Sequence, residues 1–78
     1  MITFHVLLFA AARDAAGCES VTVELPEGSR VADLADALPQ LAALLPKCRI
    51  AVNHEFAEGE HVLKAGDEIA VIPPVSGG

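Results

Sequence analysis

The two ends of this 78-residue chain both have the pattern of buried β-strands. In residues 2–10 one alternating set is apolar throughout and the other becomes apolar at Leu7 and Phe9, which predicts a central strand covered on both faces, at least toward its end. Glu68–Ile72 is a second short apolar run of this kind. A chain of this length forms one small domain, so we expect a single sheet in which the first and last strands lie side by side.

Three further strands are predicted between these ends, at residues 19–25, at residues 49–53 and around Phe56. Residues 19–25 alternate cleanly, with Val and Leu facing inward and Ser, Thr and Glu facing water. The pair Asn53-His54 suits a tight turn that leads from residues 49–53 into the short strand at Phe56. These strands would extend the sheet that the two ends begin.

Residues 29–38 are expected to form the main helix. Ser29 is its predicted N-cap, because a Ser hydroxyl can accept a hydrogen bond from a free backbone N–H of the first turn. The apolar face of this helix consists of residues at helical spacing: Val31, Leu34, Ala35 and Leu38. Pro39 ends or bends the helix. A shorter helical turn is expected at residues 11–17, where Gly17 stops it.

The resulting order is β-β-α-β-β-β, with one main helix crossing one face of a single mixed sheet. This order predicts an α+β fold of the β-grasp, or ubiquitin-like, type over residues 1–72. Residues 73–78 are expected to form a flexible C-terminal tail. An apolar content of 53% suffices for one compact core, so global disorder is excluded as an interpretation.

The charge of the chain argues against several classes of partner. The formal net charge is −6, and the five Lys and Arg residues are scattered, so binding to nucleic acid is not expected. No apolar run approaches the about 18 residues that a membrane span needs. The apolar residues 6–12 are not preceded by Lys or Arg, so we do not expect them to be a signal peptide. We expect a cytoplasmic protein without a membrane partner.

The sequence contains no pattern for self-contained catalysis or metal binding. Its three histidines share no metal-ligand spacing, so no metal site is predicted. Glu58 and Glu60 flank a turn glycine, and a solvated surface is the simpler explanation for them. Cys18 and Cys48 form no Cys-x-x-Cys pair. Free thiols in a reducing compartment are expected, although one disulfide between them is open.

The most distinctive segment is the tail, Pro73-Pro74-Val75-Ser76-Gly77-Gly78. The two prolines hold its start extended and cannot continue a central strand. A Gly-Gly tip has no side chains, so it can enter a channel that is too narrow for other residues. Six extended residues reach at most about 20 Å, which is enough to enter a pocket of another protein. An ordinary frayed terminus is the alternative interpretation.

Several segments, taken in order, resemble the MoaD/ThiS family of ubiquitin-like sulfur carriers. They are residues 6–14 (VLLFAAARD), 25–29 (LPEGS), 51–55 (AVNHE), 63–72 (LKAGDEIAVI) and the tail 73–78 (PPVSGG). Each segment alone is weakly specific. Their common order, with Gly-Gly at the last two positions, is strongly specific, and the resemblance is greatest to the carriers of molybdopterin synthase.

This resemblance implies a group-carrier mechanism at Gly78. An activating enzyme would use ATP to adenylate the Gly78 carboxylate, and a sulfur donor would displace AMP to leave a thiocarboxylate. The sulfur would then pass to cyclic pyranopterin monophosphate within a complex with the large subunit of molybdopterin synthase. The chain itself would bind no cofactor and would be a non-catalytic subunit of a sulfurtransferase.

The resemblance also assigns roles to neighbouring residues. Residues 73–76 and Gly77 would thread the tail into the partner, and Phe9, Arg13 and Ile72 are candidate docking residues. The family often has an aromatic residue at the position of Ile72. Core packing is the alternative role for Phe9, and a solvated charge is the alternative for Arg13.

Three functions therefore remain open from the sequence. The first is the sulfur carrier of molybdopterin synthase. The second is a related carrier, for thiamine thiazole or tRNA thiolation, or a protein modifier with the same chemistry at Gly78. The third is a non-catalytic β-grasp interaction module with an inert tail.

Overall fold

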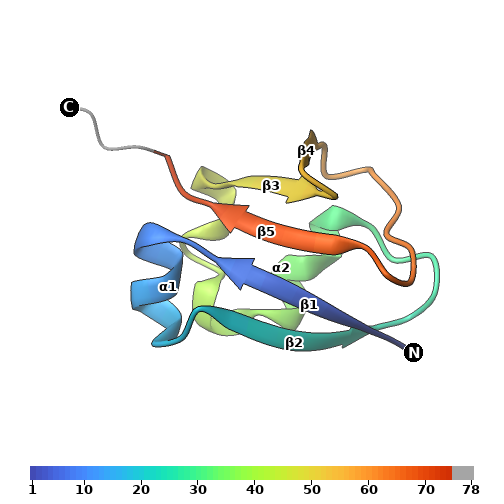
Figure 1. Ribbon diagram of the computed structural model, residues 1–78, viewed down its shortest axis with the longest axis horizontal. Coiled ribbons are helices and arrows are strands. Elements are labelled where there is room, and N and C mark those ends of the chain that lie inside the picture. Colours follow the sequence, from blue (N-terminus) through green and yellow to red (C-terminus); the bar gives the residue numbers. More distant parts are fainter. Residues whose placement is uncertain (75–78) are drawn as a thin grey trace.

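The alternating segments build one mixed sheet of five strands (Figure 1). In the computed structural model, which describes residues 1–74, the strands are β1 (Ile2–Leu8), β2 (Ser20–Leu25), β3 (Arg49–Val52), β4 (Glu55–Ala57) and β5 (Glu68–Ile72). Their order across the sheet is β2-β1-β5-β3-β4. β1 and β5 pair in parallel, and the other three neighbouring pairs are antiparallel. The first and last strands are therefore adjacent and central, as predicted.

Short helical segments cover one face of this sheet. They are α1 (Ala10–Ala16), α2 (Leu34–Ala37) and the 3-10 turns η1 (Val31–Asp33), η2 (Pro39–Leu41) and η3 (Leu45–Lys47). In Figure 1 α2 lies behind the sheet, and α1 lies beside the end at which β5 finishes. One sheet with a helical layer across a single face confirms the predicted β-grasp. Over residues 1–74, no helix is long and apolar enough to cross a membrane.

The helical layer differs in detail from the prediction. Ser29 is not an N-cap, because its hydroxyl instead donates to the Pro26 carbonyl at 2.6 Å and closes the preceding turn. The helical stretch begins one residue later, where the Arg30 N–H donates to the Asp33 carboxylate at 2.7 Å. It contains only four α-helical residues, because Leu38 precedes a proline and leaves the helical conformation at φ −125° and ψ 63°.

The short helical segment predicted at residues 11–17 is α1, which begins one residue earlier. α1 spans seven residues, and Gly17 ends it as predicted, with a left-handed φ of 76°. Ala12 is the residue of α1 that is fully buried against the core. The structure therefore has no single main helix. The helical layer over the sheet consists of α1 and the helical stretch at residues 31–47.

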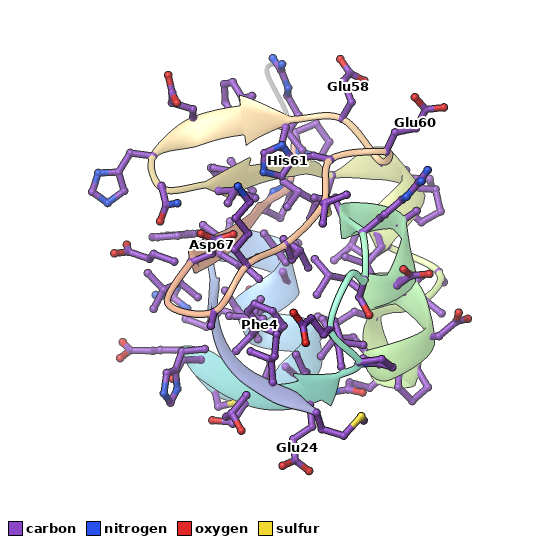
Figure 2. The ribbon with its side chains drawn as sticks, turned by 90° about the vertical axis from the view of Figure 1, so that its right-hand side faces the viewer. Phe4, Glu24, Glu58, Glu60, His61 and Asp67 are labelled. Carbon is purple, nitrogen blue, oxygen red and sulfur yellow. The ribbon has the colours of Figure 1, made fainter. Side chains whose placement is uncertain are left out.

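The core lies between the sheet and this helical layer. Figure 2 shows Phe4 there, with strands on one side and helical segments on the other. β1 contributes Phe4, Val6 and Leu8, which are at most 3% exposed. The helical stretch contributes four residues that are at most 6% exposed: Val31, Leu34, Leu38 and Leu41. The core is mostly aliphatic, in agreement with the composition.

The opposite face of the sheet is open, which contradicts the prediction that β1 is covered on both sides. Within residues 1–74, no helical segment lies over this face. Leu7 is half-buried there, and Phe9 is 48% exposed. The second apolar set of β1 is therefore a surface feature and needs a reason other than core packing.

Candidate functional site

The predicted tail begins at the end of the central strand β5. Ile72 pairs with Arg49 of β3, and the Phe9 N–H donates to the Val71 carbonyl at 3.3 Å on the other side. Pro73 is buried and Pro74 is exposed. The remaining predicted tail residues, Val75, Ser76, Gly77 and Gly78, lie outside the described residues. The end of β5 thus lies between β1 and β3.

The register of the strands sets four residues in one row across the open face. Leu7 of β1 lies opposite Ala70 of β5, Ala70 lies opposite Ala51 of β3, and Ala51 lies opposite Phe56 of β4. Large side chains thus stand at both ends of the row, and two methyl groups stand between them. Cross-strand neighbours on one face are close enough to form a continuous surface.

This arrangement leaves a hollow on the open face, which we call the alanine hollow. Its volume is about 270 Å³. It is lined by Leu7, Phe9, Ala51, His54, Phe56, Glu68, Ala70 and Ile72. Phe56 is 56% exposed, so both aromatic rings of this face are accessible. An exposed apolar patch with a polar rim is typical of a protein interaction site.

Charged groups stand at two sides of the alanine hollow. The His54 Nε2 and Glu68 Oε1 atoms are 3.2 Å apart, and both side chains are more than half exposed. The Arg49 guanidinium lies over the Phe56 ring, with its carbon 3.8 Å from the ring centroid. A cation over an aromatic face is attracted by the ring's quadrupole, so Arg49 helps to fix this wall.

A tight turn places His54 at the rim. Asn53 and His54 connect β3 to β4 with positive φ values of 53° and 70°, the geometry of a two-residue hairpin turn. The Asn53 side chain accepts from the Glu68 N–H and donates to Asp67, both at 2.9 Å. A 2.8 Å hydrogen bond from the Lys64 N–H, supported by the one from Asn53, lowers the pKa of Asp67 against the opposing effect of its burial.

The structure brings two of the three predicted docking residues together. Phe9 and Ile72 both line the alanine hollow, and the exposure of Phe9 excludes core packing as its role. Arg13 lies on α1 and lines a separate depression with Cys18 and Glu19. Four apolar members of the hollow were not predicted from the sequence: Leu7, Ala51, Phe56 and Ala70.

Among the other chemically interesting side chains, Glu58 and Cys48 line a separate depression of about 370 Å³ together with Arg49. Within residues 1–74, no three His, Cys, Asp or Glu side chains gather as a metal site would require. Figure 2 shows the carboxylates of Glu58 and Glu60 directed outward, in keeping with solvated charges. Both cysteines are free, as expected. Cys18 is exposed, whereas Cys48 is partly buried, donates to the Leu44 carbonyl at 3.3 Å and has a pKa raised by burial.

The five-stranded mixed sheet with a helical layer across one face defines a protein of the β-grasp class. The ThiS family model matches residues 6–78, and the chain belongs to this family. The molybdopterin synthase sulfur carrier subunit of Chlamydomonas reinhardtii is 39% identical over 79 residues, which cover 94% of this chain and 95% of that protein.

Two solved structures extend the comparison. The crystal structure of SAMP1 from Haloferax volcanii has a TM-score of 0.87 and 32% sequence identity, covering 97% of this chain and 99% of that one. The complex of subunits 1 and 2 of the molybdopterin-converting factor from Helicobacter pylori contains a chain with a TM-score of 0.72 and 26% identity. That match covers 99% of this chain and all of the other.

Proposed function

We propose that this chain is the sulfur carrier subunit of a molybdopterin synthase. The main support is the match to curated relatives of that name along nearly the whole length of both chains. The family match also includes the last residue, Gly78. The described surface agrees with this role, because an accessible apolar face adjoins the strand from which residues 73–78 continue.

The chemistry of the proposal takes place at the Gly78 carboxylate. A carboxylate resists nucleophilic attack because it is negatively charged. In the proposed cycle an activating enzyme transfers AMP from ATP to this carboxylate, with release of pyrophosphate. A sulfur donor then attacks the acyl-adenylate carbon, and AMP leaves. The product is a thiocarboxylate, a soft nucleophile that works as a covalent group carrier.

The proposed recipient is cyclic pyranopterin monophosphate, held by the large subunit of the synthase. The Helicobacter pylori structure is a complex of subunits 1 and 2 of that organism's molybdopterin-converting factor, which supports a large-subunit partner here. A dithiolene contains two sulfur atoms, so each product molecule requires two carriers that bear a thiocarboxylate at Gly78. The complex with the large subunit must therefore hold Gly78 in position for sulfur transfer and still release the carrier afterwards. The cytoplasmic location expected from the sequence belongs to the same proposal.

The proposal is tested by the intact mass of the chain after incubation with ATP, a sulfur donor and the activating enzyme of the same organism. We expect one oxygen to be replaced by sulfur, and no such change when Gly77 and Gly78 are deleted. Addition of the large subunit and cyclic pyranopterin monophosphate should then return the original mass and yield molybdopterin. Sulfur transfer that survives deletion of the two glycines would contradict the proposal.

A second candidate, a protein modifier, is suggested by the similarity to SAMP1, the small archaeal modifier protein 1. A protein modifier would use the same activated Gly78, but it would transfer its own chain to lysine side chains. The two functions give different products in a cell extract. A carrier returns to its original mass, whereas a modifier produces a ladder of other proteins, each heavier by one copy of this chain.

A further inference from the structure

The strand β2 forms one outer edge of the sheet, and its free side is long and unprotected. It spans six residues, whereas β4 at the other edge spans three. Proteins usually protect an edge strand with a proline, a lysine, a bulge or a covering segment. β2 contains neither proline nor lysine, its register with β1 is unbroken, and it is the outermost strand on its side of the sheet in Figure 1. This edge can therefore pair with another strand.

The hydrogen-bond pattern identifies the backbone groups that face outward from β2. The Leu8 N–H donates to the Glu19 carbonyl at 2.8 Å, directly after the last register pair of β1 and β2. Hydrogen-bonded and non-hydrogen-bonded pairs alternate along an antiparallel ladder, so every second residue from Glu19 points its backbone groups toward β1. The residues between them point their N–H and C=O groups outward: Ser20, Thr22 and Glu24. No hydrogen bond outside the ladder uses these groups within residues 1–74.

The sequence of this edge is complementary to a second copy of itself in antiparallel orientation. A two-fold axis at Thr22 sets this residue opposite its own copy, and it sets Ser20 opposite Glu24 of the second copy. The two threonines can form a favourable cross-strand pair, and the serine hydroxyl can donate to the carboxylate. On the core side, Val21 is half-buried and would be covered by Val23 of the second copy. Residues 20–24 are then all paired within β2.

The other symmetric registers are less favourable. An axis at Glu24 would set two carboxylates directly opposite each other, and such like-charge pairs are destabilising. An axis at Val23 would set Ser20 opposite Pro26, which lies beyond the strand and has no N–H to donate. An axis at Ser20 or Val21 would shorten the paired segment, because β2 begins at Ser20. The register centred on Thr22 is therefore the one that the sequence favours.

Pairing at this edge leaves the alanine hollow free. No residue of β2 lines the hollow, and β1 separates β2 from β5. Each copy has a net charge of −6, so long-range repulsion opposes the association. The contact involves one strand from each copy, which is the size of a transient interface. Salt screens the repulsion between the two copies, so added salt should strengthen the contact.

From these observations we infer that β2 is a self-pairing edge. Two copies of this chain associate through it about a two-fold axis at Thr22, and their two sheets join into one. The association is transient and depends on concentration. The inference does not rest on the proposed function, since it uses only the edge of the sheet and not residues 73–78.

Sedimentation equilibrium of the full-length chain tests the inference, at low and at high salt. The range from about 20 μM to about 2 mM suits a weak contact of this size. The weight-average mass of the native chain should rise toward that of two copies, and it should rise further at high salt. Ser20→Glu sets a carboxylate opposite Glu24 of the second copy and should raise Kd by about fivefold. Adding Glu24→Lys to Ser20→Glu makes this pair attractive and should restore the native Kd.

Two matched variants separate the local pair from the overall charge. Lys64→Gln lowers the net charge by the same one unit as Ser20→Glu, but Lys64 lies in the loop before β5, so its effect on Kd should be much smaller. Ser20→Glu combined with Glu55→Lys has the same net charge as the restoring variant. Glu55 lies on β4 at the opposite edge, so this combination should not restore the native Kd. Circular dichroism establishes that each variant retains the native fold.

Amide hydrogen exchange measured by NMR locates the contact independently of any substitution. The outward N–H groups of Thr22 and Glu24 should exchange more slowly as the protein concentration rises, whereas exchange in β4 should not change. A native chain that remains monomeric over the whole range would overturn the inference. Association that Ser20→Glu does not weaken, or that Glu55→Lys restores as well as Glu24→Lys does, would assign self-association to another surface and overturn it too.

Discussion

The side chain of Asn53 donates a 2.9 Å hydrogen bond to Asp67, fourteen residues further along the chain. Through this contact the β3–β4 turn is tied to the loop that precedes β5. The second Asp67 oxygen accepts from the Lys64 N–H at 2.8 Å. Both bonds favour the ionised carboxylate, so the pKa of Asp67 lies below its ordinary value. The turn that carries His54 is therefore held in part by the charged carboxylate of Asp67.

Asp67→Asn should lower the free energy of unfolding by about 1 kcal/mol at pH 7, because an amide cannot accept both hydrogen bonds. The folded-state pKa of Asp67 is depressed, so its stabilisation is present above the unfolded-state pKa and is lost as the pH falls through the folded-state value. The difference in unfolding free energy between the native protein and Asp67→Asn should therefore shrink as the pH falls from about 5 to about 2. Urea unfolding at a series of pH values measures it.

Asp36→Asn is the matched control, since the Asp36 carboxylate accepts no hydrogen bond within residues 1–74. Its effect should be small at every pH. A deficit of Asp67→Asn that stays constant down to pH 2 would show that the charge of Asp67 is not what stabilises the loop.

The two faces of β1 should respond very differently to the same substitution. Leu8 is 3% exposed in the core, so Leu8→Ala should cost about 2–5 kcal/mol of unfolding free energy. Leu7 is half-buried on the open face, and Leu7→Ala should cost less than about 1.5 kcal/mol. Urea denaturation of the two variants compares them directly. Equal losses would mean that the open face is packed in solution.

The two cysteines should differ in reactivity. Thiolates react and thiols do not, and burial raises the pKa of the Cys48 thiol while Cys18 is exposed. Under native conditions at pH 8 we expect iodoacetamide to modify Cys18 well before Cys48. Peptide mass mapping over time measures both rates. The same experiment in strong denaturant should remove most of the difference, and preferential native modification of Cys48 would contradict the structure.

The strands could be predicted from the sequence because their signals are local. Alternation defined β2, continuous apolar runs defined β1 and β5, and Asn53-His54 marked the turn into β4. The central position of β1 and β5 followed from their two apolar faces. The helical layer was less predictable, since the pattern of Val31, Leu34 and Leu38 is the same for one helix as for a 3-10 turn joined to a short α-helix.

The docking surface was only partly predictable, for a related reason. The second apolar face of β1 indicates burial but does not say whether the cover belongs to the same chain or to a partner. Phe9 was for that reason assigned both to the core and to docking. Ala51 and Ala70 gave no signal at all, because their role depends on a register between strands that are separate in the sequence. The one clue in the sequence was that β1 has two apolar faces, whereas the predicted helices suffice to cover only one face of the sheet.

The strand order also has a consequence for how the protein is made. β2 and β1 form one antiparallel pair, β3 and β4 form another, and β5 is the strand that joins them. An isolated two-stranded hairpin is at best marginally stable in water. During synthesis from the N-terminus, the sheet therefore cannot close until β5 has left the ribosome, and residues 73–78 follow immediately behind it. A truncated product that stops short of β5 should remain unfolded and open to proteolysis, so degradation would remove defective chains before they could compete for a partner.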